Sequence, residues 1–128
     1  MRLWLGLGVL VVLVVVLVNA VQRSERKDAE VRFQNTLATY KSALQSGATR
    51  EQVEKYLHEQ NTAFTRSCCE PGVFSDRTDL GDEPRNLFCQ PWKVSAEFQF
   101  KNAEPPADAA KGSDQLTNIA IHREGVCF

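Results

Sequence analysis

The hydrophobic residues of this chain are most concentrated at its beginning. Residues 3–21 consist of Leu, Val, Gly, Ala and Trp with a single Asn19, and they carry no charge. As a helix, this segment would span nearly the whole of a ~30 Å hydrocarbon layer. We therefore predict that residues 1–22 form a transmembrane signal-anchor and that residues 3–21 contact membrane lipid.

A cleavable secretion signal is the alternative for this segment. Val18-Asn19-Ala20 offers the small residues that signal peptidase accepts, so cleavage after Ala20 would release the rest of the chain. Against cleavage, Val and Leu extend to the edge of the polar region and no Pro or Gly lies immediately before the cut. We favour an uncleaved single-pass anchor, and the absence of a nearby Cys disfavours a lipoprotein.

The next segment is polar but keeps apolar residues at spacings of three and four, which is typical of a helix with one buried face. These residues are Ala29, Phe33, Leu37, Tyr40 and Leu44. We expect residues 23–46 to form a juxtamembrane amphipathic helix that continues the membrane helix and ends at Gly47. Packing of this face on its own domain is favoured over a coiled-coil or partner-binding seam, because the pattern covers barely two heptads.

A second helix is predicted to begin just after Gly47. Thr49 and Gln52 have the spacing of a capping box, which satisfies amide groups left free at a helix start. Val53, Tyr56 and Leu57 then fall on its inward face. The two predicted helices would form a hairpin.

The clearest predicted strand is Lys93–Lys101, in which apolar and polar residues alternate. Its inward residues are Val94, Ala96, Phe98 and Phe100. Residues 115–123 form a second strand with Ile119 and Ile121 inward. Matching the two apolar faces requires antiparallel partners whose residue numbers sum to about 217.

The region before this hairpin gives weaker signals. Residues 64–69 alternate as a short strand that ends in a turn at Glu70-Pro71-Gly72. Residues 73–86 contain Asp76, Asp79, Asp82 and Glu83 but lack the EF-hand pattern. We interpret them as a solvated loop with one short strand near Leu80.

Composition excludes several classes of function. The chain has 15 Lys and Arg against 16 Asp and Glu, spread without blocks, so it lacks the basic stripe of a nucleic-acid-binding protein. We find no catalytic constellation and no metal-ligand spacing, and we expect a non-enzymatic protein without a cofactor. His58 lies beside the apolar side of the second helix without a partner ligand, so it is interpreted as a surface residue.

Four cysteines, at positions 68, 69, 89 and 127, are the disulfide candidates. Of the three full pairings, the one that joins the adjacent Cys68 and Cys69 is disfavoured by its strained ring. The hairpin register sets Cys89 opposite Phe128, one residue out of step with Cys127, and a bulge at Gly125 or a break at Pro91 would correct the offset. Cys89–Cys127 is the bond we name; pairing of Cys89 with Cys68 or Cys69 stays open. A thiol oxidoreductase is disfavoured, because redox sites usually place two residues between their cysteines.

Compartment follows from the same cysteines. Arg23, Arg26 and Lys27 follow the apolar segment, and the positive-inside bias alone would keep the tail in the cytoplasm. Four cysteines in one small domain instead indicate an oxidising compartment. We predict an extracytoplasmic C-terminal domain on the cytoplasmic membrane.

Three stretches carry a resemblance to known proteins. They are Gly47-Ala48-Thr49-Arg50-Glu51-Gln52-Val53-Glu54-Lys55-Tyr56-Leu57, Phe98-Gln99-Phe100, and Ser113-Asp114-Gln115-Leu116 leading to Cys127-Phe128. The chain beyond Thr36 resembles a family of small, N-terminally membrane-anchored bacterial proteins without an assigned function. More remotely, its helix pair followed by an antiparallel sheet is similar to outer-membrane lipoproteins of the OmlA/BamE type, which implies a scaffolding role in the envelope.

Together these observations predict an α+β protein. An N-terminal transmembrane helix leads to a two-helix hairpin packed on an antiparallel sheet of three to four strands, and residues 47–128 form the small α+β domain. The expected function is binding or structural support in the cell envelope, with an envelope protein as the possible partner. The alternative is a secreted inhibitor or ligand-binding domain.

Overall fold

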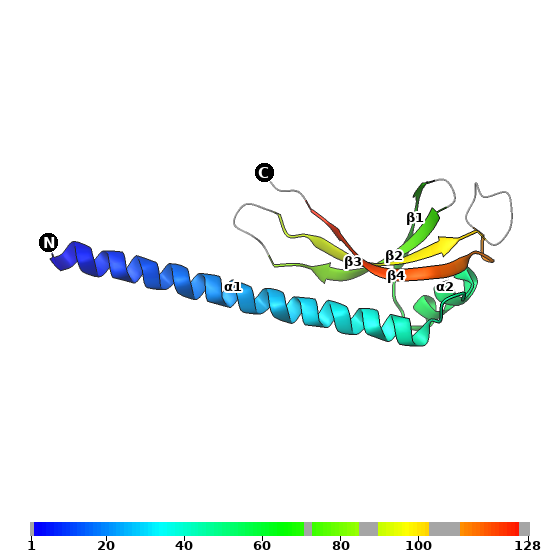
Figure 1. Ribbon diagram of the computed structural model, residues 1–128, viewed down its shortest axis with the longest axis horizontal. Coiled ribbons are helices and arrows are strands. Elements are labelled where there is room, and N and C mark those ends of the chain that lie inside the picture. The colour runs from blue at the N-terminus through cyan, green and yellow to red at the C-terminus, as the bar shows by residue number, and fades with distance from the viewer. Residues whose placement is uncertain (1, 71–72, 85–89, 103–110, 126–128) are drawn as a thin grey trace.

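The computed structural model describes residues 2–70, 73–84, 90–102 and 111–125 and shows an α+β architecture (Figure 1). A long helix, α1, and a short helix, α2, precede a four-stranded antiparallel sheet with the order β1-β2-β3-β4. The elements are α1 (Arg2–Ala43), α2 (Arg50–Glu59), β1 (Phe64–Glu70), β2 (Val73–Asp82), β3 (Lys93–Lys101) and β4 (Gln115–Glu124).

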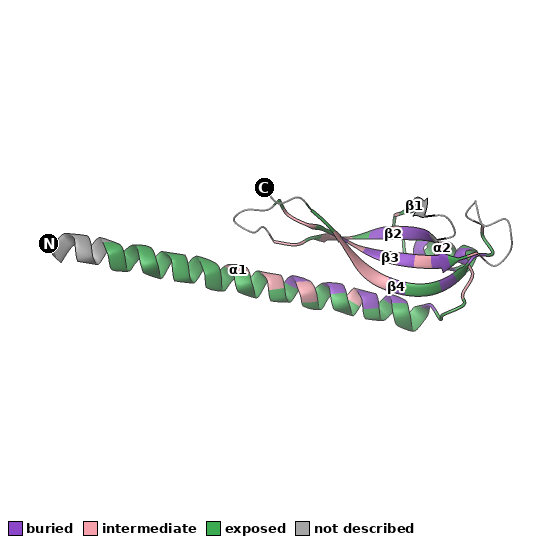
Figure 2. Cartoon of the chain, turned by 45° about the horizontal axis from the view of Figure 1, so that its top comes forward, coloured by how far each residue is buried: buried purple, intermediate pink, exposed green. Residues whose placement is uncertain are grey.

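Helix α1 is continuous through the apolar and the amphipathic segments, as predicted. Its N-terminal half extends beyond the sheet, whereas its C-terminal half lies along it (Figure 2). The predicted inward residues of this half are at most 8% exposed, which confirms that the apolar stripe packs on its own domain; they are Ala29, Phe33, Leu37, Tyr40 and Leu44.

The corner between the helices follows the predicted chemistry. Gly47 has φ +89°, a left-handed conformation that side-chain-bearing residues rarely adopt. The Thr49 hydroxyl accepts a hydrogen bond from the Gln52 amide, and the Gln52 side chain accepts one from the Thr49 amide, which completes the capping box. A short bridge between Thr49 and Gln115 then fastens this corner to the start of β4.

The β3-β4 hairpin has the predicted register over most of its length. Ala96 pairs with Ile121 and Phe98 with Ile119, and the alternating burial along β3 confirms the predicted faces. A register shift after Gln99 places Phe100 opposite Leu116. The inward face of the hairpin is therefore apolar from Ala96 and Ile121 to Phe100 and Leu116, while Arg123 lies opposite Val94 at its other end.

The interpretation of residues 73–86 as a solvated loop is wrong. Residues Val73–Asp82 form β2, an interior strand that pairs with β1 on one side and β3 on the other. Its inward residues include Asp76 and Thr78, which are 0% and 1% exposed. Because polar residues occupy inward positions, the apolar alternation that marks a strand is absent from this part of the sequence.

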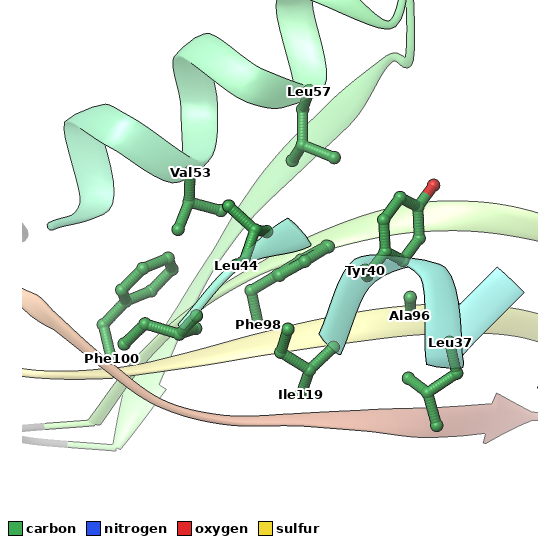
Figure 3. Packing of buried hydrophobic residues seen from close by; sticks show 10 residues of the cluster. Leu37, Tyr40, Leu44, Val53, Leu57, Ala96, Phe98, Phe100 and Ile119 are labelled. Atoms are coloured by element: carbon green, nitrogen blue, oxygen red, sulfur yellow. The ribbon is translucent and has the colours of Figure 1, made fainter. Parts of the chain in front are cut away.

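Both helices contribute to one core on a single face of the sheet. Tyr40, Val53 and Phe98 belong to the same buried cluster, although they come from α1, α2 and β3 (Figure 3). The ring of Tyr40 meets that of Phe98 edge-on at 5.4 Å between centroids, and it meets the ring of Tyr56 at 6.4 Å. A second cluster joins Ala29 and Phe33 to Val94 nearer the N-terminal half of α1.

Candidate functional site

The N-terminal half of α1 exposes an unbroken apolar surface. The Val and Leu side chains at positions 9–18 and 21 are 49–63% exposed, and no described part of the chain covers them. This is the one helix of the described residues that is long and apolar enough to cross a membrane.

The surface of α1 that meets the sheet begins one residue after this apolar segment. Gln22 and Arg26 are half-buried, and they stand on the same helical face as Ala29, Glu30 and Phe33. The predicted stripe therefore extends two turns further toward the N-terminus than its apolar residues indicated. The apolar pattern did not include Gln22 and Arg26 because both residues are polar.

A group of ion pairs attaches the segment of α1 around Glu30 to the sheet. The guanidinium of Arg123 in β4 binds the Glu30 carboxylate, and its Nε lies 3.6 Å from a Glu83 oxygen. A hydrogen bond from Gln34 lowers the pKa of Glu30, burial acts in the opposite direction, and Arg123 lowers it further, so the net shift is downward. Glu30 therefore keeps its negative charge at neutral pH.

A second group of charges is buried beneath α2. Arg50 is 2% exposed, and both carboxylates that face it, Asp76 of β2 and Asp114 before β4, are 0% exposed. The guanidinium of Arg50 donates two hydrogen bonds to Asp76, its Nη1 lies 3.9 Å from an Asp114 oxygen, and its charge stands 5.1 Å from the centre of the Phe100 ring. We call Arg50, Asp76 and Asp114 the buried ionic cluster.

Further polar groups surround the buried ionic cluster. Glu54, one turn along α2, accepts from Arg50 Nε at 3.2 Å and from two nitrogens of Arg66 at 2.9 Å each. Asp114 accepts from the side chain of Asn102 and the backbone amide of Lys111. Burial raises the pKa of Asp76, although Arg50 pulls it down.

The buried ionic cluster joins three segments that are distant in sequence. Arg50 also donates its backbone amide to the Asp114 carbonyl at 2.7 Å, so α2 is attached to the start of β4 by both backbone and side chain. Because the charged atoms are sealed from solvent, the arrangement suits a structural clamp more than a site for chemistry. The one signal of this cluster in the sequence is that Arg50 and Asp114 both lie in the stretches that carry the resemblance.

No protein-family model, curated protein or solved structure matches this chain. The resemblance to anchored bacterial proteins and to the OmlA/BamE type therefore stays a prediction. The proposed function therefore rests on the geometry of the described residues.

The sheet face turned away from the helices is polar and internally bonded. Glu97 accepts from Arg77 at 2.9 Å and 3.0 Å, and from Ser75 at 3.0 Å. Burial raises the pKa of Glu97, but the hydrogen bonds from Arg77, Ser75 and Gln99 outweigh it and the net pKa is lowered. Gln99 in turn accepts from Asn118, so the ladder crosses from β2 to β4.

An open hollow of about 360 Å³ lies where β1 begins, beside the last residues of β2. Phe64 and Val94 are among its apolar lining residues, while Arg77, Lys93 and Glu124 provide charges of both signs. This mixture is compatible with a peptide or a zwitterionic group and selects no single ligand.

The remaining residues considered as site candidates are the histidines and the cysteines. His58 is exposed on α2, as predicted, while His122 is half-buried in β4 opposite Ser95. Cys89 and Cys127 lie outside the described residues, as do the side chains of Cys68 and Cys69, so the disulfide stays a prediction. Among the described residues no three His, Cys, Asp or Glu side chains gather as metal ligands.

Proposed function

We propose that this protein is a non-enzymatic, single-pass protein of the bacterial cell envelope, with its α+β domain outside the cytoplasmic membrane and a binding or structural role. One observation carries the proposal. A single helix exposes the apolar side chains at positions 9–18 and 21 and supplies core residues to the folded domain over its second half. Each buried Val or Leu gains about 1.5–3 kcal/mol relative to water, so lipid is the natural solvent for the first half.

The extracytoplasmic orientation is proposed from the cysteines. Four cysteines in a domain of this size are typical of an oxidising compartment. The positive-inside bias of Arg23, Arg26 and Lys27 opposes this orientation, but the bias weakens when a long domain follows the helix.

A binding or structural role is supported by how the polar groups are used. The buried ionic cluster is closed to solvent and engaged in holding α2, and the ladder around Glu97 is internally satisfied. The hollow beside β1 and the open sheet face leave room for an envelope protein as partner. A helix pair on an antiparallel sheet would agree with the scaffolding role of OmlA/BamE-type proteins.

A fusion experiment tests the anchor and the orientation. A reporter that is active only in the periplasm, fused after Phe128, should be active and should sediment with the membranes. The same fusion lacking residues 1–22 is the control and should be inactive in the cytoplasm. An inactive periplasmic reporter, together with an active cytoplasmic one at the same site, would reverse the orientation.

The released domain is the competing outcome. Cleavage after Ala20 would leave every sheet-contacting residue of α1 in the mature chain, so the secreted domain could keep its fold. Soluble periplasmic protein beginning at Val21 would support a secreted inhibitor or ligand-binding domain and would exclude the anchor.

A further inference from the structure

One end of the sheet points toward the apolar half of α1. Strand β4 runs antiparallel to the direction of α1, because its start is bonded to the corner after α1 and its end is paired with Glu30 (Figure 1). At that end β2 finishes at Asp82, β3 begins at Lys93, and β4 finishes at Glu124. We call this the proximal end of the sheet.

The proximal end is held at a fixed height along α1. No Pro or Gly interrupts the sequence between Val9 and Ser46, so α1 has no sequence-encoded hinge. Ala29 and Phe33 pack on Val94, and the Arg123 ion pairs fasten β4 to Glu30. A rigid helix that spans a bilayer therefore also sets the distance between the bilayer and the sheet.

That distance can be estimated from the rise per residue of the helix and of the strand. Glu30 follows Val21 by nine residues, or roughly 13 Å of helix. Gly125 lies two residues beyond Arg123, or about 7 Å further toward the apolar segment along the strand. With β4 taken as parallel to α1, the proximal end is about 7 Å above the last apolar residue of α1, a height comparable with the ~5–8 Å that headgroups add to each side of the hydrocarbon layer.

Trp92 lies at this height. Its carbonyl accepts from the Glu83 amide at 2.8 Å, and its ring packs so closely over Gly125 that a Cβ at position 125 would come within 2.7 Å of it. The residue is half-buried, so part of its surface is exposed. Tryptophan is enriched at membrane interfaces, where its apolar ring and its N–H group meet lipid and water together.

We propose that the proximal end of the sheet rests on the bilayer and that Trp92 contacts the phospholipid headgroup layer as a second membrane contact beside α1. This inference depends on the anchoring part of the proposed function. The two described basic residues at this end of the sheet have carboxylate partners, Lys93 with Asp82 at 3.9 Å and Arg123 with Glu30 and Glu83, and Glu124 adds a negative charge. The contact therefore depends on the ring, and zwitterionic phosphatidylcholine is sufficient for it.

Tryptophan quenching in vesicles tests this contact. The full chain with Trp4→Phe keeps Trp92 as its single tryptophan. In phosphatidylcholine vesicles, a spin label on the lipid headgroup should quench Trp92 strongly, whereas a label deep in the acyl chain should quench it at least twofold less. Trp92 emission that neither label changes would overturn the proposal.

A second reporter separates this inference from the anchor. Trp4→Phe and Trp92→Phe combined with Leu13→Trp place the single tryptophan in the middle of the apolar segment, where the deep label should quench it. Deep quenching at position 13 without headgroup quenching at Trp92 would leave the anchor standing and reject the contact. Absence of both would reject the anchor as well.

An insertion provides the matched control. Seven polar, helix-forming residues placed between Val21 and Gln22 add about two turns, or roughly 10 Å, and leave every contact from Gln22 onward unchanged. The domain should then stand clear of the headgroups, and most of the headgroup quenching of Trp92 should be lost. Undiminished quenching would show that the height set by α1 does not position Trp92, and would overturn the proposal.

Discussion

Arg50 is the residue on which the position of α2 most depends. It belongs to the capped first turn of α2, yet its side chain is buried between carboxylates from β2 and from the segment before β4. Taking such a group out of water is costly, and the cost is recovered only when its hydrogen bonds and charges are matched. Asp76 accepts two hydrogen bonds from the guanidinium and Asp114 supplies a second negative charge 3.9 Å from Nη1, which makes the three residues mutually dependent.

Arg50→Ala should therefore destabilise the fold by about 3–5 kcal/mol, because it leaves Asp76 and Asp114 buried without their counter-charge. Arg66→Ala is the matched control. Arg66 is 64% exposed and pairs with Glu54 at the surface, so its loss should cost at most about 1 kcal/mol. Urea unfolding of the full chain in detergent measures both. Equal midpoints for the two variants would contradict a structural role for the buried ionic cluster.

At the scale of elements, β2 and β3 differ in their sequence patterns, because only β3 has the regular apolar alternation that predicts a strand. Along β3 every inward residue is apolar, so the alternation predicts both the strand and its buried face. Along β2 the inward residues Asp76 and Thr78 are polar and are satisfied by Arg50 and by the Ala63 carbonyl. A buried polar residue looks like a surface residue until its partner is known, which is why β2 resembled a loop.

Phe98→Ala tests the element that the sequence predicts best. Phe98 is fully buried between Tyr40 and Ile119, so truncation leaves a cavity and should lower the unfolding free energy by about 3–5 kcal/mol. That is comparable with the whole stability of a small domain. Val31→Ala, at a site 57% exposed on α1, should change it by less than about 1 kcal/mol. Unchanged thermal melting of Phe98→Ala would show that the faces of β3 are wrongly assigned.

For the whole molecule, α1 joins two environments. Its first half exposes the Val and Leu side chains at positions 9–18 and 21, and its second half completes the core of the domain. Since no Pro or Gly separates the halves, the membrane and the sheet are connected by one rigid rod. The orientation of the domain on the bilayer is consequently a property of the fold.

The cysteines provide a test of the compartment in which the whole domain lies. The β3-β4 pairing keeps a residue sum of 217 from Lys93 and Glu124 to Gln99 and Asn118, which is the register from which the Cys89–Cys127 bond is predicted. Non-reducing peptide mapping of protein taken from its native membrane should find these two cysteines linked. Four alkylatable thiols would remove both the bond and the reason for placing the domain outside the cytoplasm.

The sequence by itself determined the features that depend on local periodicity and capping. The apolar segment, the stripe on α1, the Thr49 cap and the faces of β3 each repeat within a few residues, so no distant contact is needed to recognise them. Only the tertiary structure decided that β2 is an interior strand, that Arg50 is buried against Asp76 and Asp114, and that contact with α1 begins at Gln22. In each of these cases a polar group becomes buried because a partner far along the chain satisfies it, and such pairings are fixed by the fold and leave no periodic trace in the sequence.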